Sequence, residues 1–208
     1  AFYVGENIWI TARHVINDCS KVYLKDGPNK KIIEKILIHP NSDLALFKYN
    51  SFDIKYFNIA QKISEKSFSS GYPAGNPGDA ALQLLGFMAM EARSYNILEK
   101  HSIYAVLDKN PRNLLSFGGL SGGPTFDDYG LINGVVVSEF KRRGQIGAVG
   151  LNQINWLIAA SNKEAEFFDK ISKTNENAIK LDKIDKNYKK IGNELRKSKS
   201  ISKLICIA

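Results

Sequence analysis

The stretch Phe117–Gly130 reads "FGGLSGGPTFDDYG" and places five glycines around a single serine, Ser121. An ordered glycine costs about 0.5–1 kcal/mol relative to alanine, so the cluster indicates either a loose linker or a backbone held in a special geometry. The residues from Pro124 onward, "PTFDDYGLINGVVV", favour a strand, a turn and a second strand, because the proline and the Asp-Asp-Tyr-Gly turn interrupt any helical pattern. This stretch therefore predicts β structure on the C-terminal side of the serine.

The glycine cluster is close to two known motifs that the rest of the chain excludes. Residues 119–123 fit G-x-S-x-G, but an α/β-hydrolase places a helix directly after that serine, and its acid and its histidine come later in the chain. All three histidines, His14, His39 and His101, precede Ser121. A phosphate-binding loop is excluded as well, because G-x-x-x-x-G-K-[ST] needs a lysine that this stretch lacks.

Short strand signals fill the chain from residue 1 to about residue 150. They are rich in Ile, Val, Phe and Tyr and are separated by Gly, Pro, Asn and Asp, as in "KVYLKDG", "LALFKYN", "SIYAVLD" and "GQIGAVGL". Without amphipathic helices between them, they predict an all-β barrel or sandwich rather than a parallel α/β sheet. Phe2-Tyr3-Val4 already reads as a strand in progress, so we expect the sequence to be a fragment whose first strand is incomplete.

The hydrophobic pattern changes to a helical period at Asn152, in "NQINWLIAASNKEAEFFDKI". We divide the chain into a domain of residues 1–160 and a basic, amphipathic, helical segment of residues 161–208. The apolar residues of that segment recur at steps of three and four: Ala178, Leu181, Ile184, Tyr188, Ile191 and Leu195. Three interpretations stay open for it: a helix docked on its own domain, a surface for a coiled-coil or other protein partner, and a contact with an anionic membrane.

Composition excludes several classes of function. The 208 residues are 44% hydrophobic and 24% charged, which is enough for one substantial core or two small ones. The apolar runs are far shorter than the roughly 18 residues of a membrane helix, so we expect no membrane span. The net charge of +8 falls largely on residues 161–208, which hold 12 Lys/Arg and 7 Asp/Glu. Because no basic and aromatic side chains interleave in the rest, we do not expect nucleic-acid binding.

The two cysteines, Cys19 and Cys206, lie at opposite ends of the chain. That spacing disfavours a disulfide framework, and it provides no cluster of thiolates for zinc. It slightly favours a reducing, cytoplasmic compartment, although the sequence leaves the location open.

Histidine, aspartate and serine occur in an order that one class of enzymes uses for nucleophilic catalysis. His14 lies in "WITARHVI", Asp43 in "HPNSDLALF" and Ser121 in "GGLSGGP". These three contexts resemble those of the trypsin/chymotrypsin-like serine peptidases. The spacings of 29 and 78 residues, together with "GYPAG" and "GQIGAVGLNQINWLI", are most similar to the compact bacterial HtrA-type branch. The resemblance covers nearly all of residues 1–160 and implies a mainly β fold of two packed six-stranded barrels, with the site in the cleft between them.

The resemblance also implies a role for each residue. His14 is the general base that takes the serine proton and then the acid that protonates the leaving amine. Asp43 fixes the tautomer of His14 and supports its charged form, and Ser121 is the nucleophile. The backbone N–H groups of Gly119 and Ser121 form the oxyanion hole. Gly119 then has a reason to be glycine, because its backbone must turn an N–H toward the oxyanion.

Other acids and histidines compete for these roles. Asp26 and Asp53 also precede the serine and are alternatives to Asp43. His39 lies four residues before Asp43 and is followed by a proline, so we expect it in a turn. We expect His101 on a loop between strands, and both histidines at the surface or in turns.

Two positions depart from the family pattern. Leu120 stands where many trypsin-like enzymes carry an aspartate that pairs with a newly cut N-terminus, so activation by that kind of cleavage is not expected. The polar strand residue that supports the triad aspartate in relatives aligns near Val137, with Ser138 next to it, and the register between these two stays open.

The resemblance places the base of the substrate pocket at Leu115, Ser116 and Phe117, with Ser138 and Glu139 on the opposite wall. The base carries no carboxylate of the kind that selects Lys or Arg. The sequence therefore predicts a small or medium apolar residue on the acyl side of the cleaved bond (P1), although Glu139 could change this preference.

The sequence thus predicts a serine endopeptidase that cleaves protein or peptide substrates through an acyl-enzyme, with no metal and no organic cofactor. A regulatory protein partner could bind through the C-terminal segment and order the loop around Ser121. The alternative is a protease-fold binding or scaffold module that is catalytically silent.

Overall fold

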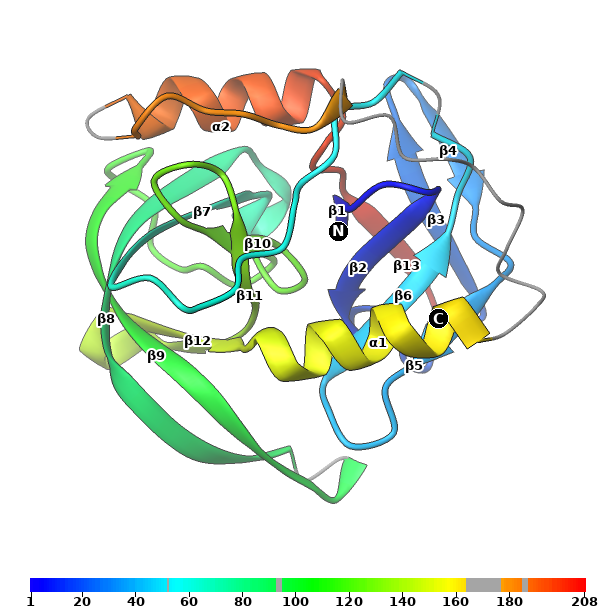
Figure 1. Ribbon diagram of the computed structural model, residues 1–208, viewed down its shortest axis with the longest axis horizontal. Helices are drawn as coiled ribbons and strands as arrows, with labels where there is room; N and C mark the ends of the chain where they lie inside the picture. Colours follow the sequence, from blue (N-terminus) through cyan, green and yellow to red (C-terminus); the bar gives the residue numbers. More distant parts are fainter. Residues whose placement is uncertain (52, 93–94, 164–176, 185–186) are drawn as a thin grey trace.

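The computed structural model describes residues 1–51, 53–92, 95–163, 177–184 and 187–208. Its strands form two groups that lie side by side, with one helix across the top and another across the front (Figure 1). The expectation of a mainly β chain is confirmed. The two groups correspond to the first and second halves of the sequence, except that the last strand joins the first group.

The second group is a closed antiparallel barrel of six strands in the order β10-β11-β12-β9-β8-β7. The strands are β7 (Lys66–Gly71), β8 (Gly78–Ala92), β9 (Ile97–Asn110), β10 (Pro124–Phe126), β11 (Ile132–Phe140) and β12 (Gln145–Val149). The strand, turn and strand expected after Ser121 are β10 and β11. β8 and β9 are much longer than the other strands, and their hairpin extends beyond the barrel as an arm (Figure 1).

The first group consists of two sheets and not of one closed six-stranded barrel, which corrects the expectation for this half. The four-stranded sheet contains β1 (Phe2–Tyr3), β2 (Ile8–Ala12), β6 (Leu44–Lys48) and β5 (Ile36–Ile38). The three-stranded sheet contains β13 (Leu204–Ile207), β3 (Lys21–Asp26) and β4 (Asn29–Ile32). All four residues of β4 are exposed, so this strand has no apolar face with which to close a barrel.

Helix α1 (Leu151–Lys163) connects the two halves. It contacts β5 and β6 of the first half and β11 of the second (Figure 1). Three short 3-10 helices complete the described fold: η1 (Arg13–Val15), η2 (Pro73–Gly75) and η4 (Lys141–Arg143). One core cluster contains residues of both halves, among them Ile10, Leu46, Phe126 and Val135.

The C-terminal segment is only partly helical, which corrects the expectation for residues 161–208. Helix α2 covers Tyr188–Lys197, residues 177–184 contain no α-helix, and residues 204–207 form β13. Residues 164–176, where the first helical pattern was expected to continue, lie outside the described residues. Five apolar residues of this segment belong to the core shared by both halves: Ile179, Ile184, Tyr188, Ile191 and Leu195. Docking against its own protein therefore accounts for the apolar stripe.

The two cysteines form a disulfide, which corrects the expectation that they do not pair. The Cα atoms of Cys19 and Cys206 are 5.4 Å apart, because β13 returns to pair with β3. The two cysteines are 187 residues apart in the sequence, so their spacing gave no indication that they pair. The argument for a reducing compartment from unpaired cysteines no longer holds.

A buried ion pair fastens α2 to the barrel. Arg196 donates to both carboxylate oxygens of Asp79 at 2.6 and 3.1 Å, and their side chains are 6% and 0% exposed. The same guanidinium donates to the carbonyls of Gly71 and Gly78, which face each other across β7 and β8. Gly192 allows this approach, because a Cβ at that position would lie 2.0 Å from Oδ1 of Asp79. α2 is thus tied to the base of the loop between β7 and β8.

We expect Arg196→Met to lower the free energy of unfolding by about 3–5 kcal/mol, because it leaves the buried Asp79 carboxylate without its cation. Urea denaturation measures this change. Lys190→Met is the matched control on the same helix, since Lys190 is exposed and 4.0 Å from Glu194, and such surface pairs contribute about 0–1 kcal/mol. Equal, small effects of the two substitutions would contradict the role of the ion pair.

Candidate active site

His14 and Asp43 meet at one edge of the first half. His14 lies in η1, directly after β2, and Asp43 lies in the turn before β6. Asp43 Oδ2 is 2.6 Å from the Nδ1 atom of His14, and Oδ1 accepts a hydrogen bond from the backbone N–H of His14 at 2.9 Å. One carboxylate thus holds both the ring and the backbone of the histidine. The Nε2 atom of His14 is left for another partner.

Ser121 follows a tight turn in the second half. The N–H of Leu120 donates to the carbonyl of Phe117 at 2.8 Å, and the N–H of Gly122 donates to Val136 of β11 at 2.8 Å. Gly122 has a φ of +78° and packs against β2, where an added Cβ would lie 2.9 Å from the N atom of Ala12. This contact brings the serine turn next to the segment that leads into His14.

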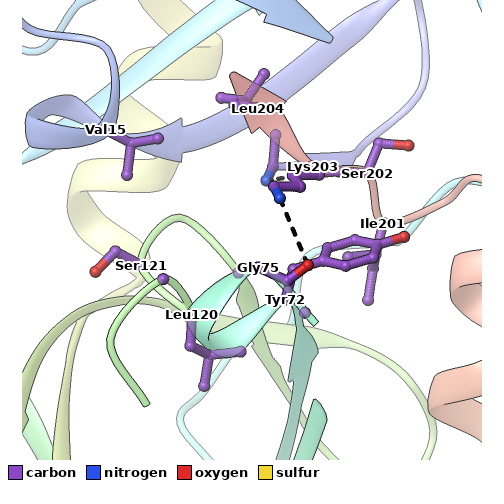
Figure 2. Close-up of a pocket in the computed structure, with 13 residues that line it drawn as sticks. Val15, Tyr72, Gly75, Leu120, Ser121, Ile201, Ser202, Lys203 and Leu204 are labelled. Atoms are coloured by element: carbon purple, nitrogen blue, oxygen red, sulfur yellow. Dashed lines mark hydrogen bonds between the residues drawn. The ribbon is translucent and has the colours of Figure 1, made fainter. Parts of the chain in front are cut away.

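A cavity of about 160 Å³ separates these segments, and Val15 and Ser121 both line it. Figure 2 shows Ser121 at one end of the cavity, with its hydroxyl oxygen directed away from Tyr72 and Lys203. The structure therefore brings Asp43 into direct contact with His14. Ser121 lines a cavity that is also lined by Val15, the residue after His14.

The backbone around Gly119 is tightly packed and has a positive φ. Gly119 has a φ of +89°, and an added Cβ would lie 3.1 Å from both Ala74 N and Tyr72 O. The carbonyl of Gly118 accepts a hydrogen bond from the N–H of Ala74 at 2.6 Å. Among the described residues, the N–H groups of Gly119 and Ser121 have no backbone acceptor. These two donors lie on either side of Leu120, whose own N–H is bonded to Phe117.

Three of the five predicted pocket residues come together. Glu139 accepts hydrogen bonds from Ser116 Oγ at 2.6 Å and from the N–H of Phe117 at 2.9 Å. Leu115 is 83% exposed and takes no part in these contacts, so its placement in the pocket base stays a prediction. Ser138 lies beside Glu139 on β11, and its Oγ is buried with no hydrogen-bond partner among the described residues.

The side chain that accepts the backbone N–H of Asp43 was not predicted from the sequence. It is Glu99 of β9, whose carboxylate accepts hydrogen bonds from the N–H of Asp43 at 3.0 Å and from Ser42 Oγ at 2.6 Å. His101 Nε2 lies 3.3 Å from the same carboxylate. Neither Val137 nor Ser138 makes this contact. The sequence did contain a sign that Glu99 is buried. Side chains alternate between the two faces of a strand, so Glu99 and His101 lie on the same inward face of β9 as Ile97 and Ile103.

Both remaining histidines are buried, which corrects the expectation of surface positions. His39 does lie at the turn between β5 and β6, where its Nδ1 accepts a hydrogen bond from the N–H of Asn41. His101 lies within β9 and not on a loop. The ring of His39 lies 4.4 Å from that of Trp156 on α1, and burial lowers the pKa of His39. Of the alternative acids, Asp53 is exposed in a turn and Asp26 ends β3, whereas Asp43 is the acid bonded to His14.

The described residues contain no group of three or more His, Cys, Asp or Glu that could hold a metal ion. Within the same residues, no helix is long and apolar enough to cross a membrane.

We expect Gly122→Ala to separate the serine turn from β2, since the new methyl group would overlap Thr11 and Ala12. Gly144→Ala is the matched control: Gly144 also has a positive φ, of +60°, but an added Cβ would meet no atom within 4 Å. The control should cost only about 1 kcal/mol, the usual strain of this backbone conformation. Urea denaturation should show a clearly larger loss for Gly122→Ala, and equal losses would contradict the close packing.

The sequence matches no protein-family model and no curated protein. Solved structures do match in fold. The active form of the Rv3671c protease from M. tuberculosis is 15% identical, with a TM-score of 0.63 over 76% of this chain and 70% of that chain. A human pathogenic astrovirus serine protease is 18% identical, with a TM-score of 0.52 over 72% and 80% of the two chains. The MamO protease domain from Magnetospirillum magneticum is 15% identical, with a TM-score of 0.51 over 75% and 85%. The chain therefore has the fold of the chymotrypsin-like serine proteases.

Proposed function

We propose that this protein is a serine endopeptidase that cleaves peptide bonds through an acyl-enzyme. The observation that carries the proposal is the short contact between Asp43 and Nδ1 of His14, with Ser121 on the facing glycine turn. A serine hydroxyl is a weak nucleophile until a neutral imidazole takes its proton, and an imidazole held by a carboxylate at Nδ1 presents Nε2 for that purpose.

The proposed reaction has two halves. Ser121 Oγ attacks the peptide carbonyl carbon while His14 Nε2 accepts the hydroxyl proton, and the N–H groups of Gly119 and Ser121 stabilise the negative oxygen of the tetrahedral intermediate. The C–N bond then breaks, and His14 returns the proton to the leaving amine. Water attacks the resulting ester in the same way, with His14 again as base, and releases the acid product and Ser121.

A fluorophosphonate probe tests this proposal, because it phosphonylates only a serine activated by a neighbouring base. We expect the protein to be labelled at Ser121, as located by mass spectrometry of the labelled peptide, and Ser121→Ala to abolish labelling. Asp43→Asn should lower kcat by about 10⁴-fold, because it favours the wrong histidine tautomer. Ser20→Ala removes an exposed serine elsewhere and is the control.

Two results would contradict the peptidase. One is an unlabelled native protein; the other is Ser121→Ala with unchanged peptide hydrolysis. The first would favour the catalytically silent binding module. Labelling only in the presence of another protein would favour a partner-switched enzyme. The apolar stripe that first suggested a partner surface packs largely in the protein's own core, so such a partner would have to use other parts of the surface.

We expect peptides with a small or medium apolar P1 residue to be cleaved fastest in a library. The Glu139 carboxylate is already engaged by Ser116 and by the N–H of Phe117, so it is not free to select Lys or Arg. Glu139→Gln removes the charge and keeps an acceptor, and we expect it to leave the P1 preference unchanged. Fastest cleavage after Lys or Arg, lost in Glu139→Gln, would show that this assignment is wrong.

A further inference from the structure

The arm formed by β8 and β9 reaches from the second half to the turns that carry His14 and Asp43. The two strands pair along the arm from Met88 and His101 to Ala92 and Ile97. Near its tip, the ring of Tyr95 lies 4.1 Å from the guanidinium of Arg13, the residue before His14. The arm thus contacts the first half at the site itself.

Glu99 is the residue of the arm that touches the turn of Asp43. Its two carboxylate oxygens accept separate hydrogen bonds from that turn, one from the backbone N–H of Asp43 at 3.0 Å and one from Ser42 Oγ at 2.6 Å. The side chain of Glu99 is only 2% exposed. Two bonds from adjacent residues to one buried group fix the position of the turn and also its orientation.

Simple packing does not explain a carboxylate at this position. Removing a carboxylate from water is costly unless hydrogen bonds and an opposite charge compensate, and an apolar side chain would fill the same space without that cost. Here the two carboxylate oxygens of Glu99 accept hydrogen bonds from the turn that carries Asp43. The Nε2 atom of His101 lies 3.3 Å from the same carboxylate. The arrangement stabilises one geometry of that turn.

Hydrogen bonds around Glu99 favour its ionised form. The titratable groups that face it are His101 on its own strand, and Asp43 and His39 on the connection between β5 and β6. Burial by itself raises the pKa of Glu99, but the hydrogen bonds from His101, Ser42 and the Asp43 N–H outweigh it, so the net pKa lies below the usual value. Glu99 therefore stays a full acceptor through the neutral range.

We propose that Glu99 is a positioning residue, which holds the Ser42–Asp43 turn so that the Asp43 carboxylate reaches both the backbone N–H and Nδ1 of His14. The expected effect of Glu99 on the reaction rate rests on the proposed peptidase function. Its expected effect on the geometry of Asp43 and His14 does not. Asp43 makes its two bonds to His14 at 2.9 and 2.6 Å, so a small rotation of the turn would lengthen at least one of them.

A matched pair of variants tests the proposal. Glu99→Gln keeps a carbonyl acceptor for the Asp43 N–H and an amide that can bond to Ser42, whereas Glu99→Met keeps the volume and removes every acceptor. Leu98→Ala is the control on the same arm, since Leu98 is 73% exposed and directed away from the turn. Circular dichroism and urea denaturation establish that each variant folds.

The first readout does not need catalysis. The proton of His14 Nδ1, held in a short bond to Asp43, gives a far-downfield NMR resonance in acidic buffer, and its loss in His14→Gln assigns it. We expect this resonance in the native protein, in Leu98→Ala and in Glu99→Gln, and we expect its loss or a clear upfield shift in Glu99→Met. An unshifted resonance in folded Glu99→Met would overturn the proposal, whether or not the protein is a peptidase.

The second readout is kinetic. We expect Glu99→Met to lower kcat by about 10²-fold, the effect of misplacing a reacting group by about 1 Å, with KM unchanged and with most of kcat retained in Glu99→Gln. Equal kcat in both variants would overturn the proposal. If Glu99→Met does not fold, Ser42→Ala removes one of the two bonds and leaves the carboxylate with His101; a shifted resonance then supports the proposal, and an unchanged one overturns it. A native protein that cleaves no peptide refutes only the proposed function, since the resonance still decides on Glu99.

Discussion

The site depends on a fixed arrangement of two halves that each hold only part of it. His14 and Asp43 come from the first half and Ser121 from the second, so any sliding between the halves would separate the proposed base from the proposed nucleophile. Three contacts resist such sliding: α1 against strands of both halves, Gly122 against β2, and the shared apolar core. The close approach at Gly122 leaves the least room, because protein interiors have little space to yield.

Leu120 shows how the serine turn is fixed without the buried aspartate that many trypsin-like enzymes use. Leu120 is 1% exposed and lies in a core cluster within the barrel, with Leu82, Tyr104 and Val136. An added Cβ at Gly71 would be 2.7 Å from Cδ1 of Leu120, so the leucine fills the space beside the loop between β7 and β8. Apolar packing, which needs no newly formed terminus, therefore anchors the residue between Gly119 and Ser121.

The sequence allowed the local features to be predicted and hid the long-range ones. The order and contexts of His14, Asp43 and Ser121 predicted the candidate site. The strand pattern predicted the β structure of the second half, which forms a closed barrel. The disulfide could not be predicted, because it depends on the pairing of β13 with β3, which lie at opposite ends of the chain. Glu99 was missed for the same reason: its parity along β9 shows that it is buried, but not that the arm brings it to Asp43. The first half is open at β4, whose residues are all exposed. The strand pattern of the sequence did not distinguish this exposed strand from a buried one.

The C-terminal segment packs against the loop that supports the serine turn. The serine turn rests on η2, where Ala74 N–H bonds to Gly118. η2 in turn lies beside Lys203, whose Nζ atom is 3.5 Å from the carbonyl of Gly75 (Figure 2). Arg196 holds the base of the same loop through Asp79. Each of these supports comes from the chain itself, so the proposed oxyanion donors have their backing in the isolated protein. The basic segment, for which docking on its own domain was one of three open interpretations, is therefore part of the framework of the candidate site.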